Sequence, residues 1–395
     1  MRFSSRTEWN TEESELARAH RLHTQAGLPL ADLTASNPTL CGFTYPSDML
    51  AALSDERALV YDPQPRGLET ARMAVSAYYA RHGAAVKPEQ VVLTTSTSEA
   101  YSFLFRLLCD AGGEILVLQP GYPLFDFLAG LDDLRLKAVP LVYDHGWQID
   151  PESLRQAVTA ETRAVVLVHP NNPTGHFTKK WEAAELASLC RKHDLALIVD
   201  EVFLDYGFAG NMPSFAAGIE GLPVFVVSGL SKIAALPQMK AAWIVATGPE
   251  NDQALARLEV IADTFLSMNA PVQWALPAWL EQREAIQGQI RERVKANLAE
   301  LDRQLAAQEA TQRLEAEGGW YAVLRIPAVQ PDELTTRELL ARGVWVHPGY
   351  FFGMAGAGWL VVSLLAREAE FRMGVTKLIA YVVKHQNGNE EGVLL

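Results

Sequence analysis

The sequence predicts an α/β protein with a mostly parallel seven-stranded sheet covered by helices, together with a smaller α+β domain. Through the middle of the chain, short apolar runs alternate with amphipathic stretches, which is typical of strands joined by crossover helices. Near Pro249 this alternation gives way to a long helical region. The 395 residues are enough for one large domain and a smaller one.

The predicted strands are short apolar runs. They lie at Val91–Thr94, Ile115–Leu118, Leu136–Val139, Ala164–Val168, Ala196–Val199, Val224–Val227 and Ala242–Ala246. The helices expected between them are Leu68–His82, Glu99–Cys109, Pro151–Ala157 and Lys179–Lys192. Ligands of such sheets bind at the carboxyl ends of the strands. The chemistry is therefore expected in the loops that follow these strands.

The C-terminal part begins with a helical region from about Asn251 to Ala310, which we expect to be interrupted near Pro271 and Pro277. The small unit follows, with elements expected at Trp320–Ile326, Asp332–Ala341, Val344–Val346 and Trp359–Leu364 and a closing helix. We expect residues 1–45 to form an arm that joins the small domain. Residues 46–275 would form the large domain, and 276–395 the long helix and the small domain.

The composition of the chain excludes several classes of protein. Hydrophobic residues make up 49% and charged residues 21% of the chain, as in globular proteins. A net charge of −13 argues against a nucleic-acid or membrane-surface partner. Three cysteines are too few for a disulfide framework or a zinc site, and no secretory signal or membrane-spanning run is visible. We therefore expect a cytoplasmic protein with small-molecule ligands and no metal.

The strongest chemical motif is Ser228-Gly-Leu-Ser-Lys232, directly after a predicted strand. A lysine that is partly desolvated there has a lowered pKa and can form a Schiff base with an aldehyde. A solvated loop lysine is the alternative.

Two other strand ends carry polar residues. Asp200 ends the apolar run Leu197-Ile-Val, where a carboxylate can pair with a protonated pyridine nitrogen. A helix cap or a structural ion pair is the alternative. The segment His169-Pro-Asn-Asn-Pro-Thr-Gly175 forms a tight turn that presents the amide of Asn172, although an ordinary turn explains its proline and glycine equally well.

A fourth segment, Thr94-Thr-Ser-Thr-Ser-Glu99, opens a predicted helix. Hydroxyls and unpaired backbone N–H groups at a helix N-terminus can hold a phosphate. A capping box would give much the same sequence.

In chain order, these motifs resemble the fold-type I pyridoxal-phosphate aminotransferases of class I/II. The matching segments are Tyr61 to Gly67, Ser96-Thr97-Ser98, Pro120-Gly-Tyr122-Pro, Asn172-Pro-Thr-Gly, Asp200-Glu and Ser231-Lys232. The resemblance covers nearly the whole chain. It implies pyridoxal 5′-phosphate as cofactor, an amino acid and a 2-oxo acid as substrates, and a homodimer with active sites at the interface.

The resemblance also implies roles for single residues. Lys232 would hold the cofactor and move a proton during transfer. Asp200 would pair with the pyridine nitrogen, Asn172 would bond the phenolic oxygen, and Tyr122 would stack on the ring. The phosphate would be lined by Ser96, Thr97, Ser98 and Ser231, and by Tyr61 of the neighbouring subunit.

Three positions depart from the family pattern. Lys240 stands where an arginine usually grips the phosphate, so the charge is kept but the bidentate fork is lost. Phe203 replaces a tyrosine that donates to the phenolic oxygen. Val361 replaces the arginine that usually binds the substrate carboxylate, and valine cannot pair with a carboxylate. Four other residues lie in segments that line the site in the family and are candidates for binding this carboxylate: Arg66, Arg325, His347 and Lys240.

Two alternatives to an aminotransferase stay open at this point. Another pyridoxal-phosphate enzyme of the same fold, such as a lyase, an eliminase or an oxidase-like enzyme, would use the same cofactor residues. A binding protein with reduced catalysis would explain Phe203, Lys240 and Val361. The joint presence of Lys232, Asp200, Asn172 and Tyr122 argues against the second alternative. The loop from His347 to Gly353, which carries Tyr350 and Phe351, is expected at the substrate entrance or as a packed aromatic loop.

Overall fold

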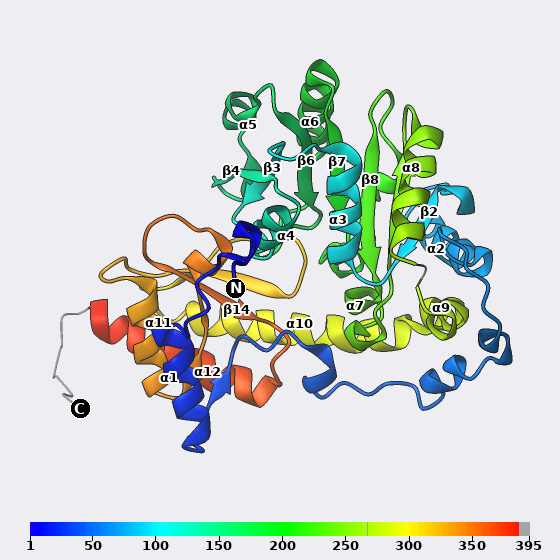
Figure 1. Cartoon of the computed structure of the whole chain (residues 1–395). Helices are drawn as coiled ribbons and strands as arrows, with labels where there is room; N and C mark the ends of the chain where they lie inside the picture. Colours follow the sequence, from blue (N-terminus) through cyan, green and yellow to red (C-terminus); the bar gives the residue numbers. More distant parts are fainter. Residues whose placement is uncertain (267, 387–395) are drawn as a thin grey trace.

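The large sheet has eight strands in the order β2-β9-β8-β7-β6-β3-β4-β5. The structure, a computed structural model, describes residues 1–266 and 268–386 (Figure 1). The strands are β2 (Val91–Thr94), β3 (Glu114–Gln119), β4 (Arg135–Tyr143), β5 (Trp147–Ile149), β6 (Thr162–Val168), β7 (Ala196–Asp200), β8 (Val224–Gly229) and β9 (Ala242–Thr247). All seven predicted strands are present. The eighth, β5, is a three-residue edge strand antiparallel to β4 that the sequence pattern did not indicate.

Strand directions place the functional edge of the sheet. Strands β8, β7, β6, β3 and β4 are parallel neighbours. Strand β9 is antiparallel to both β8 and β2, so β2 runs in the same direction as β8. The carboxyl ends of β2, β3, β6, β7 and β8 therefore lie at one edge. Every residue of β7 and β8 is buried, because helices cover both faces.

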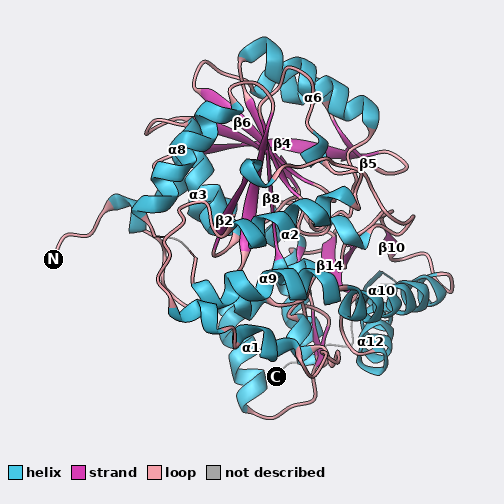
Figure 2. Ribbon diagram, turned by 90° about the vertical axis from the view of Figure 1, so that its right-hand side faces the viewer, coloured by secondary structure: helices cyan, strands magenta, loops and turns pink. Residues whose placement is uncertain are grey.

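Helices pack on both faces of this sheet (Figure 2). The helices of the large unit are α2 (Glu69–Ala80), α3 (Thr97–Leu108), α4 (Phe125–Leu131), α5 (Pro151–Ala157), α6 (Lys180–His193), α7 (Leu230–Ile233), α8 (Asn251–Thr264) and α9 (Ala270–Gln282). Apolar residues of α2, α6 and α9 share one buried cluster. Those of α3, α4 and α8 share another. The short helices α4 and α7 were not predicted, because seven or four residues are too few to show a helical period.

The small unit holds a four-stranded antiparallel sheet in the order β10-β11-β14-β13. Its strands are β10 (Gln312–Arg313), β11 (Tyr321–Arg325), β13 (His347–Pro348) and β14 (Trp359–Ser363). The helices around it are α1 (Glu15–Gln25), α10 (Glu284–Leu305), α11 (Asp332–Ala341) and α12 (Glu368–Gln386) (Figure 1). In a separate pair, β1 (Ala31–Asp32) runs parallel to β12 (Val344–Trp345), which ties the N-terminal segment to this unit.

The long helical region is divided differently from the prediction. Helix α8 ends at Thr264 and α9 begins at Ala270, so the interruption near Pro271 is present. The interruption expected at Pro277 was wrong, because this proline lies inside α9 and the chain instead breaks at Arg283. A proline removes one helical hydrogen bond, and the buried apolar side of α9 holds the helix together across it. We propose three segments, 1–45, 46–275 and 276–395. The boundary between the second and the third, at residues 275 and 276, falls within α9.

Among the residues that the structure describes, none of the helices is both long and apolar enough to cross a membrane.

Candidate active site

Five strands deliver the predicted site residues to one edge of the large sheet. Ser96 follows β2, Tyr122 follows β3, Asn172 follows β6, Asp200 ends β7, and Lys232 lies in α7 directly after β8. Because these strands all point the same way, segments that are far apart in the sequence meet at this edge.

Lys232 lies against two aromatic rings. Its Nζ atom is 5.0 Å from the centre of the Trp320 ring and 5.6 Å from that of Phe203. Both aromatic side chains are buried, at 0% and 3% exposure. Burial lowers the pKa of Lys232 to about 8, and the charge of Asp200 opposes this shift. The lysine is therefore much closer to its neutral, nucleophilic form than an exposed lysine would be.

Side chains from three segments hold the backbone around Lys232. The Tyr206 hydroxyl donates to the carbonyl oxygen of Lys232 at 2.8 Å, and Gln287 Nε2 donates to that of Ile233 at 2.7 Å. The Tyr45 hydroxyl donates to the carbonyl oxygen of Ala235 at 2.7 Å. The last carbonyls of a short helix have no helical partner. These three bonds supply side-chain donors to carbonyls in α7 and just after it, which helps to fix the position of the lysine.

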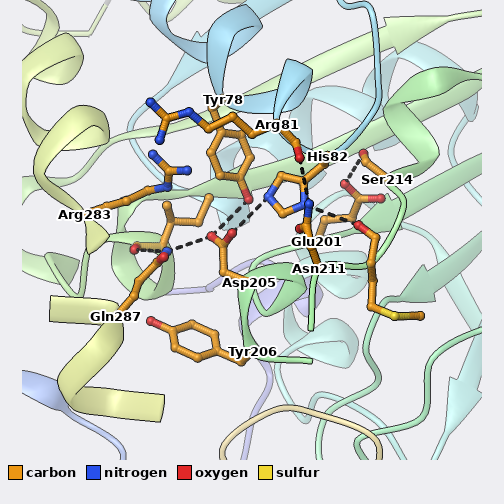
Figure 3. A network of polar contacts seen from close by, with 12 residues as sticks. Tyr78, Arg81, His82, Glu201, Asp205, Tyr206, Asn211, Ser214, Arg283 and Gln287 are labelled. Atoms are coloured by element: carbon orange, nitrogen blue, oxygen red, sulfur yellow. Dashed lines mark hydrogen bonds and ion pairs between the residues drawn. The ribbon is translucent and has the colours of Figure 1, made fainter. Parts of the chain in front are cut away.

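Gln287 also belongs to a polar network around Asp205 (Figure 3). Asp205 accepts hydrogen bonds from Gln287 at 2.8 Å and from Tyr78 at 3.2 Å, and it pairs with His82 Nε2 at 2.9 Å. Burial alone would lower the pKa of His82, but the hydrogen bond and charge of Asp205 outweigh it and raise this pKa. The network connects α2, the segment after β7 and α10 to the helix that carries Lys232.

Glu201, the neighbour of Asp200, is fully buried. Its carboxylate accepts from Ser214 Oγ at 2.6 Å (Figure 3). It also accepts from the Phe215 N–H at 2.7 Å. Burial raises the pKa of Glu201 to about 7, against the effect of these two donors. Glu201 thus anchors the 214–215 segment.

Asp200 is held by two donors. The N–H of Val202 donates to Oδ1 at 3.0 Å, and the hydroxyl of Tyr101 donates to Oδ2 at 2.9 Å. Asp200 is only 6% exposed. Burial raises its pKa to about 6, while the two hydrogen bonds and the charge of Lys232 oppose that rise. A buried carboxylate of this kind suits an ion pair with a protonated ring nitrogen.

The hydroxyl-rich segment after β2 caps helix α3. Ser96 is the N-cap residue, and its Oγ accepts from the N–H of Glu99 at 3.1 Å. The Glu99 carboxylate accepts from the N–H of Thr95 at 2.6 Å. Ser96 therefore caps helix α3, as in the capping-box interpretation of this segment. Thr97 and Ser98 occupy the first turn, where backbone N–H groups have no helical acceptor and can bind an anion.

Asn172 has a buried side-chain oxygen, Oδ1, without a hydrogen-bond partner among the described residues. Its neighbour Asn171 is different, because its Oδ1 accepts from the Thr174 hydroxyl at 2.8 Å within the turn. Buried polar atoms are normally paired. Because Oδ1 is an acceptor, the missing partner is a hydrogen-bond donor, which a ligand with a protonated phenolic hydroxyl could supply.

Tyr122 is partly exposed at the same edge, and its ring packs edge-on against Phe125 with centroids 5.6 Å apart. The preceding N–H, of Gly121, donates to the carbonyl oxygen of Phe352 at 2.9 Å. The aromatic loop after β13 therefore lies against the loop that carries Tyr122. Tyr350 and Phe351 of this loop are partly exposed, and their place at a substrate entrance stays a prediction.

Among the described residues, the side chains of three predicted phosphate residues form no hydrogen bond or ion pair with the side chain of Lys232 or Asp200. Ser231 is half-buried in α7. Lys240 is exposed and has a left-handed backbone with φ of 52°. Tyr61 is 79% exposed in the loop before α2. Their roles toward the phosphate stay predictions.

The departure at Val361 is clear in the structure. Val361 is fully buried and lies between Val323 of β11 and His347 of β13 in the small sheet. Arg325 stacks on Trp359 and donates to two backbone carbonyls. The guanidinium of Arg325 is therefore already held by the Trp359 ring and these two carbonyls.

The other cations named for the carboxylate are also constrained. Arg66 pairs with Glu259 at 3.1 Å and donates to the Glu89 carbonyl. His347 carries a buried Nδ1 without a partner among the described residues. Burial lowers the pKa of His347 to about 4, so its ring is neutral at ordinary pH. The wall around Val361 therefore presents a neutral imidazole in place of a cation.

Sequence reasoning missed two residues of this site. Trp320 was noted only as the start of a strand, and Tyr101 only as part of a helix. Both contact their functional partners across long sequence separations, 99 residues in the case of Tyr101 and Asp200. An aromatic hydroxyl on the otherwise apolar side of α3 was the available signal for Tyr101.

Comparison with known proteins finds aminotransferases among the relatives of this chain. The chain is 30% identical over 374 residues to the aspartate/prephenate aminotransferase of Thermus thermophilus, covering 91% of this chain and 93% of that protein. It is 29% identical over 279 residues to the glutamate-pyruvate aminotransferase AlaA of Escherichia coli, covering 69% and 68%. A solved mutant of Thermus thermophilus aspartate aminotransferase superposes with a TM-score of 0.84 at 26% identity, covering 97% of this chain and all of that one.

The fold is that of an aminotransferase. The family model described as "Aminotransferase class I and II" matches residues 36–378. The chain belongs to this family, whose members depend on pyridoxal phosphate.

Proposed function

We propose that this aminotransferase uses pyridoxal 5′-phosphate bound covalently to Lys232. The observation that carries the proposal is the environment of the lysine: two buried aromatic rings within 5.6 Å, a lowered pKa of about 8, and the neighbouring charge of Asp200. When bound, the cofactor supplies an electron sink for the carbon that carries the amino group. Lys232 would accept and return the proton of that carbon.

The remaining cofactor contacts are proposed from the fit of single groups. Asp200 would pair with the ring nitrogen, and the Asn172 amide would bond the phenolic oxygen. Tyr122 would cover the ring and exclude water. The first turn of α3, with Thr97 and Ser98, would hold the phosphate. Ser96, Ser231 and Lys240 would complete its surroundings.

A homodimer is proposed because the segment before α2 exposes several apolar side chains. Leu59, Val60 and Tyr61 are 88%, 66% and 79% exposed. Such a contiguous apolar surface is typical of a protein interface. A neighbouring subunit would bury it and bring Tyr61 to the other active site. A cytoplasmic location is likewise proposed, and the three cysteines are free thiols.

For substrates we propose an amino acid and a 2-oxo acid. The names of the relatives make aspartate, glutamate, prephenate and pyruvate the first to test. The test follows the amino nitrogen: the protein is loaded with pyridoxal phosphate and given ¹⁵N-labelled donor and unlabelled acceptor. The proposal expects label in the new amino acid with the wild type and none with Lys232→Ala. Release of labelled ammonia without an acceptor would instead indicate a lyase.

A further inference from the structure

The hydroxyl of Tyr101 reaches the carboxylate of Asp200 from helix α3. The hydrogen bond to Oδ2 measures 2.9 Å, and Oδ1 is bound on its other side by the N–H of Val202 at 3.0 Å. Tyr101 is 1% exposed. Both carboxylate oxygens are therefore fixed, one by the backbone of the Asp200 segment itself and one by a side chain from another element.

Helix α3 joins two ends of the proposed cofactor site. Its first turn carries Thr97 and Ser98, and Tyr101 follows three to four residues later, which places it one turn further along on the same side. The same rigid element thus connects the proposed phosphate position to the carboxylate. A shift of α3 would move both together.

The ring of Tyr101 is itself held in place. It packs edge-on against Phe125 with centroids 5.0 Å apart, and Phe125 packs edge-on against Tyr122 at 5.6 Å. One row of aromatic rings therefore runs from Tyr122 to the residue that binds Asp200. Packing on this row restricts the direction in which the hydroxyl points.

The charge balance at Asp200 depends on this hydroxyl. Burial favours the neutral acid and raises the pKa of Asp200, whereas the Val202 and Tyr101 hydrogen bonds favour the carboxylate. Burial and the charge of Asp200 raise the pKa of Tyr101 well above its ordinary value, so its hydroxyl stays protonated and donates. The other titratable groups that sense the Asp200 charge are Lys232, Glu201, Tyr79 and Tyr122.

We propose that Tyr101 is a positioning residue that keeps Asp200 ionised and oriented for pairing with the ring nitrogen of pyridoxal phosphate. The inference rests on the proposed cofactor. Without the hydroxyl, Oδ2 loses its donor inside a buried site, and the carboxylate form becomes less favourable.

The first test uses the cofactor-free protein. Carboxyl ¹³C NMR follows the titration of Asp200, with Asp200→Asn to assign the signal. The Tyr101→Phe variant should titrate at a higher pH than the wild type. The control is Tyr79→Phe, because Tyr79 is also fully buried and hydrogen-bonded, to Trp243 Nε1 at 3.1 Å, but does not bond Asp200. An unchanged Asp200 titration in Tyr101→Phe would overturn the proposal.

The second test compares two cofactors by equilibrium titration: pyridoxal phosphate and its analogue with CH in place of the ring nitrogen. The Tyr101→Phe change should weaken pyridoxal phosphate about tenfold, the size of one charge-assisted hydrogen bond, and leave the analogue nearly unaffected. Equal weakening of both would show a packing role only and overturn the proposal. A wild type that binds neither cofactor would overturn the proposed function as well, so the two failures are distinguishable.

Discussion

The Nζ atom of Lys232 lies 5.0 Å from the centre of the Trp320 ring, although β8 and β11 bring these residues from different units of the chain. A buried indole excludes water from one side of the amine, and hydration is what favours the charged form. The aromatic wall therefore explains how a lysine in a short polar segment acquires a pKa of about 8.

Replacing the indole ring of Trp320 should raise the pKa of Lys232. In Trp320→Leu, water gains access to the amine, and the pKa of Lys232 should rise from about 8 toward its ordinary value of 10.5. The pH dependence of covalent labelling by an aldehyde, read at Lys232 by mass spectrometry, measures this. The control is Trp345→Leu, because Trp345 stacks on His20 in the small unit. An unshifted labelling profile would contradict the role given to Trp320.

The buried pair of His82 and Asp205 predicts pH-dependent stability. The folded-state pKa of His82 is raised, so the pair stabilises the fold fully below the unfolded pKa of 6.5 and loses this contribution as pH rises through the folded value. His82→Gln should therefore cost about 2 kcal/mol near pH 6 and less near pH 9. Urea unfolding at both pH values measures the difference.

A matched control is His145→Gln, because His145 is an exposed loop residue. It should leave the free energy of unfolding unchanged at both pH values. If His82→Gln destabilised the protein equally at both, the protonated pair would not be the source of the stabilisation.

Tyr206 should stabilise the position of Lys232 through a single hydrogen bond. In Tyr206→Phe the carbonyl oxygen of Lys232 loses its side-chain donor and keeps only backbone donors such as the N–H of Ala235 at 3.3 Å. This loss should cost about 1 kcal/mol and weaken pyridoxal phosphate binding. Tyr381→Phe removes a comparable bond, to Glu338, in the small unit. It should lower stability without changing cofactor affinity. Equal cofactor affinities for Tyr206→Phe and the wild type would contradict the prediction.

An arginine at position 361 should make the stability of the protein depend on a bound carboxylate. Val361 is fully buried among apolar groups, so Val361→Arg should lower the free energy of unfolding by about 3 kcal/mol or more. A small dicarboxylate such as succinate would supply a partner and raise the melting temperature of the variant more than that of the wild type. Val361→Met tests the change of volume alone. No difference in the response to succinate would contradict this account of the site wall.

Much of the fold was predictable because the signals are local. Strand β2 and helices α5 and α11 have the predicted bounds, since each is set by a compact apolar run or by a turn residue at its start. Strand β5 has only three residues and pairs with the edge of the sheet, so no local period reveals it. Pro277 was misleading because tertiary packing of α9 outweighs the loss of one helical hydrogen bond.

The candidate site was predictable where residues follow strand ends. Lys232, Asp200 and Asn172 were located by that rule, and the structure places all three at one edge. Trp320 and Tyr101 were not, because their relation to Lys232 and Asp200 depends on how distant elements pack. The supporting bonds from Gln287 to the α7 backbone and from Tyr45 to the backbone just after α7 were unpredictable for the same reason.

The most direct test of the central claim locates the cofactor on the chain. The protein is loaded with pyridoxal phosphate, treated with borohydride to fix the cofactor on its lysine, digested and sequenced by mass spectrometry. The account predicts the modification on the peptide that contains Lys232, and its loss in Lys232→Ala. Modification of another lysine such as Lys240, or none at all, would contradict the claim that Lys232 holds the cofactor.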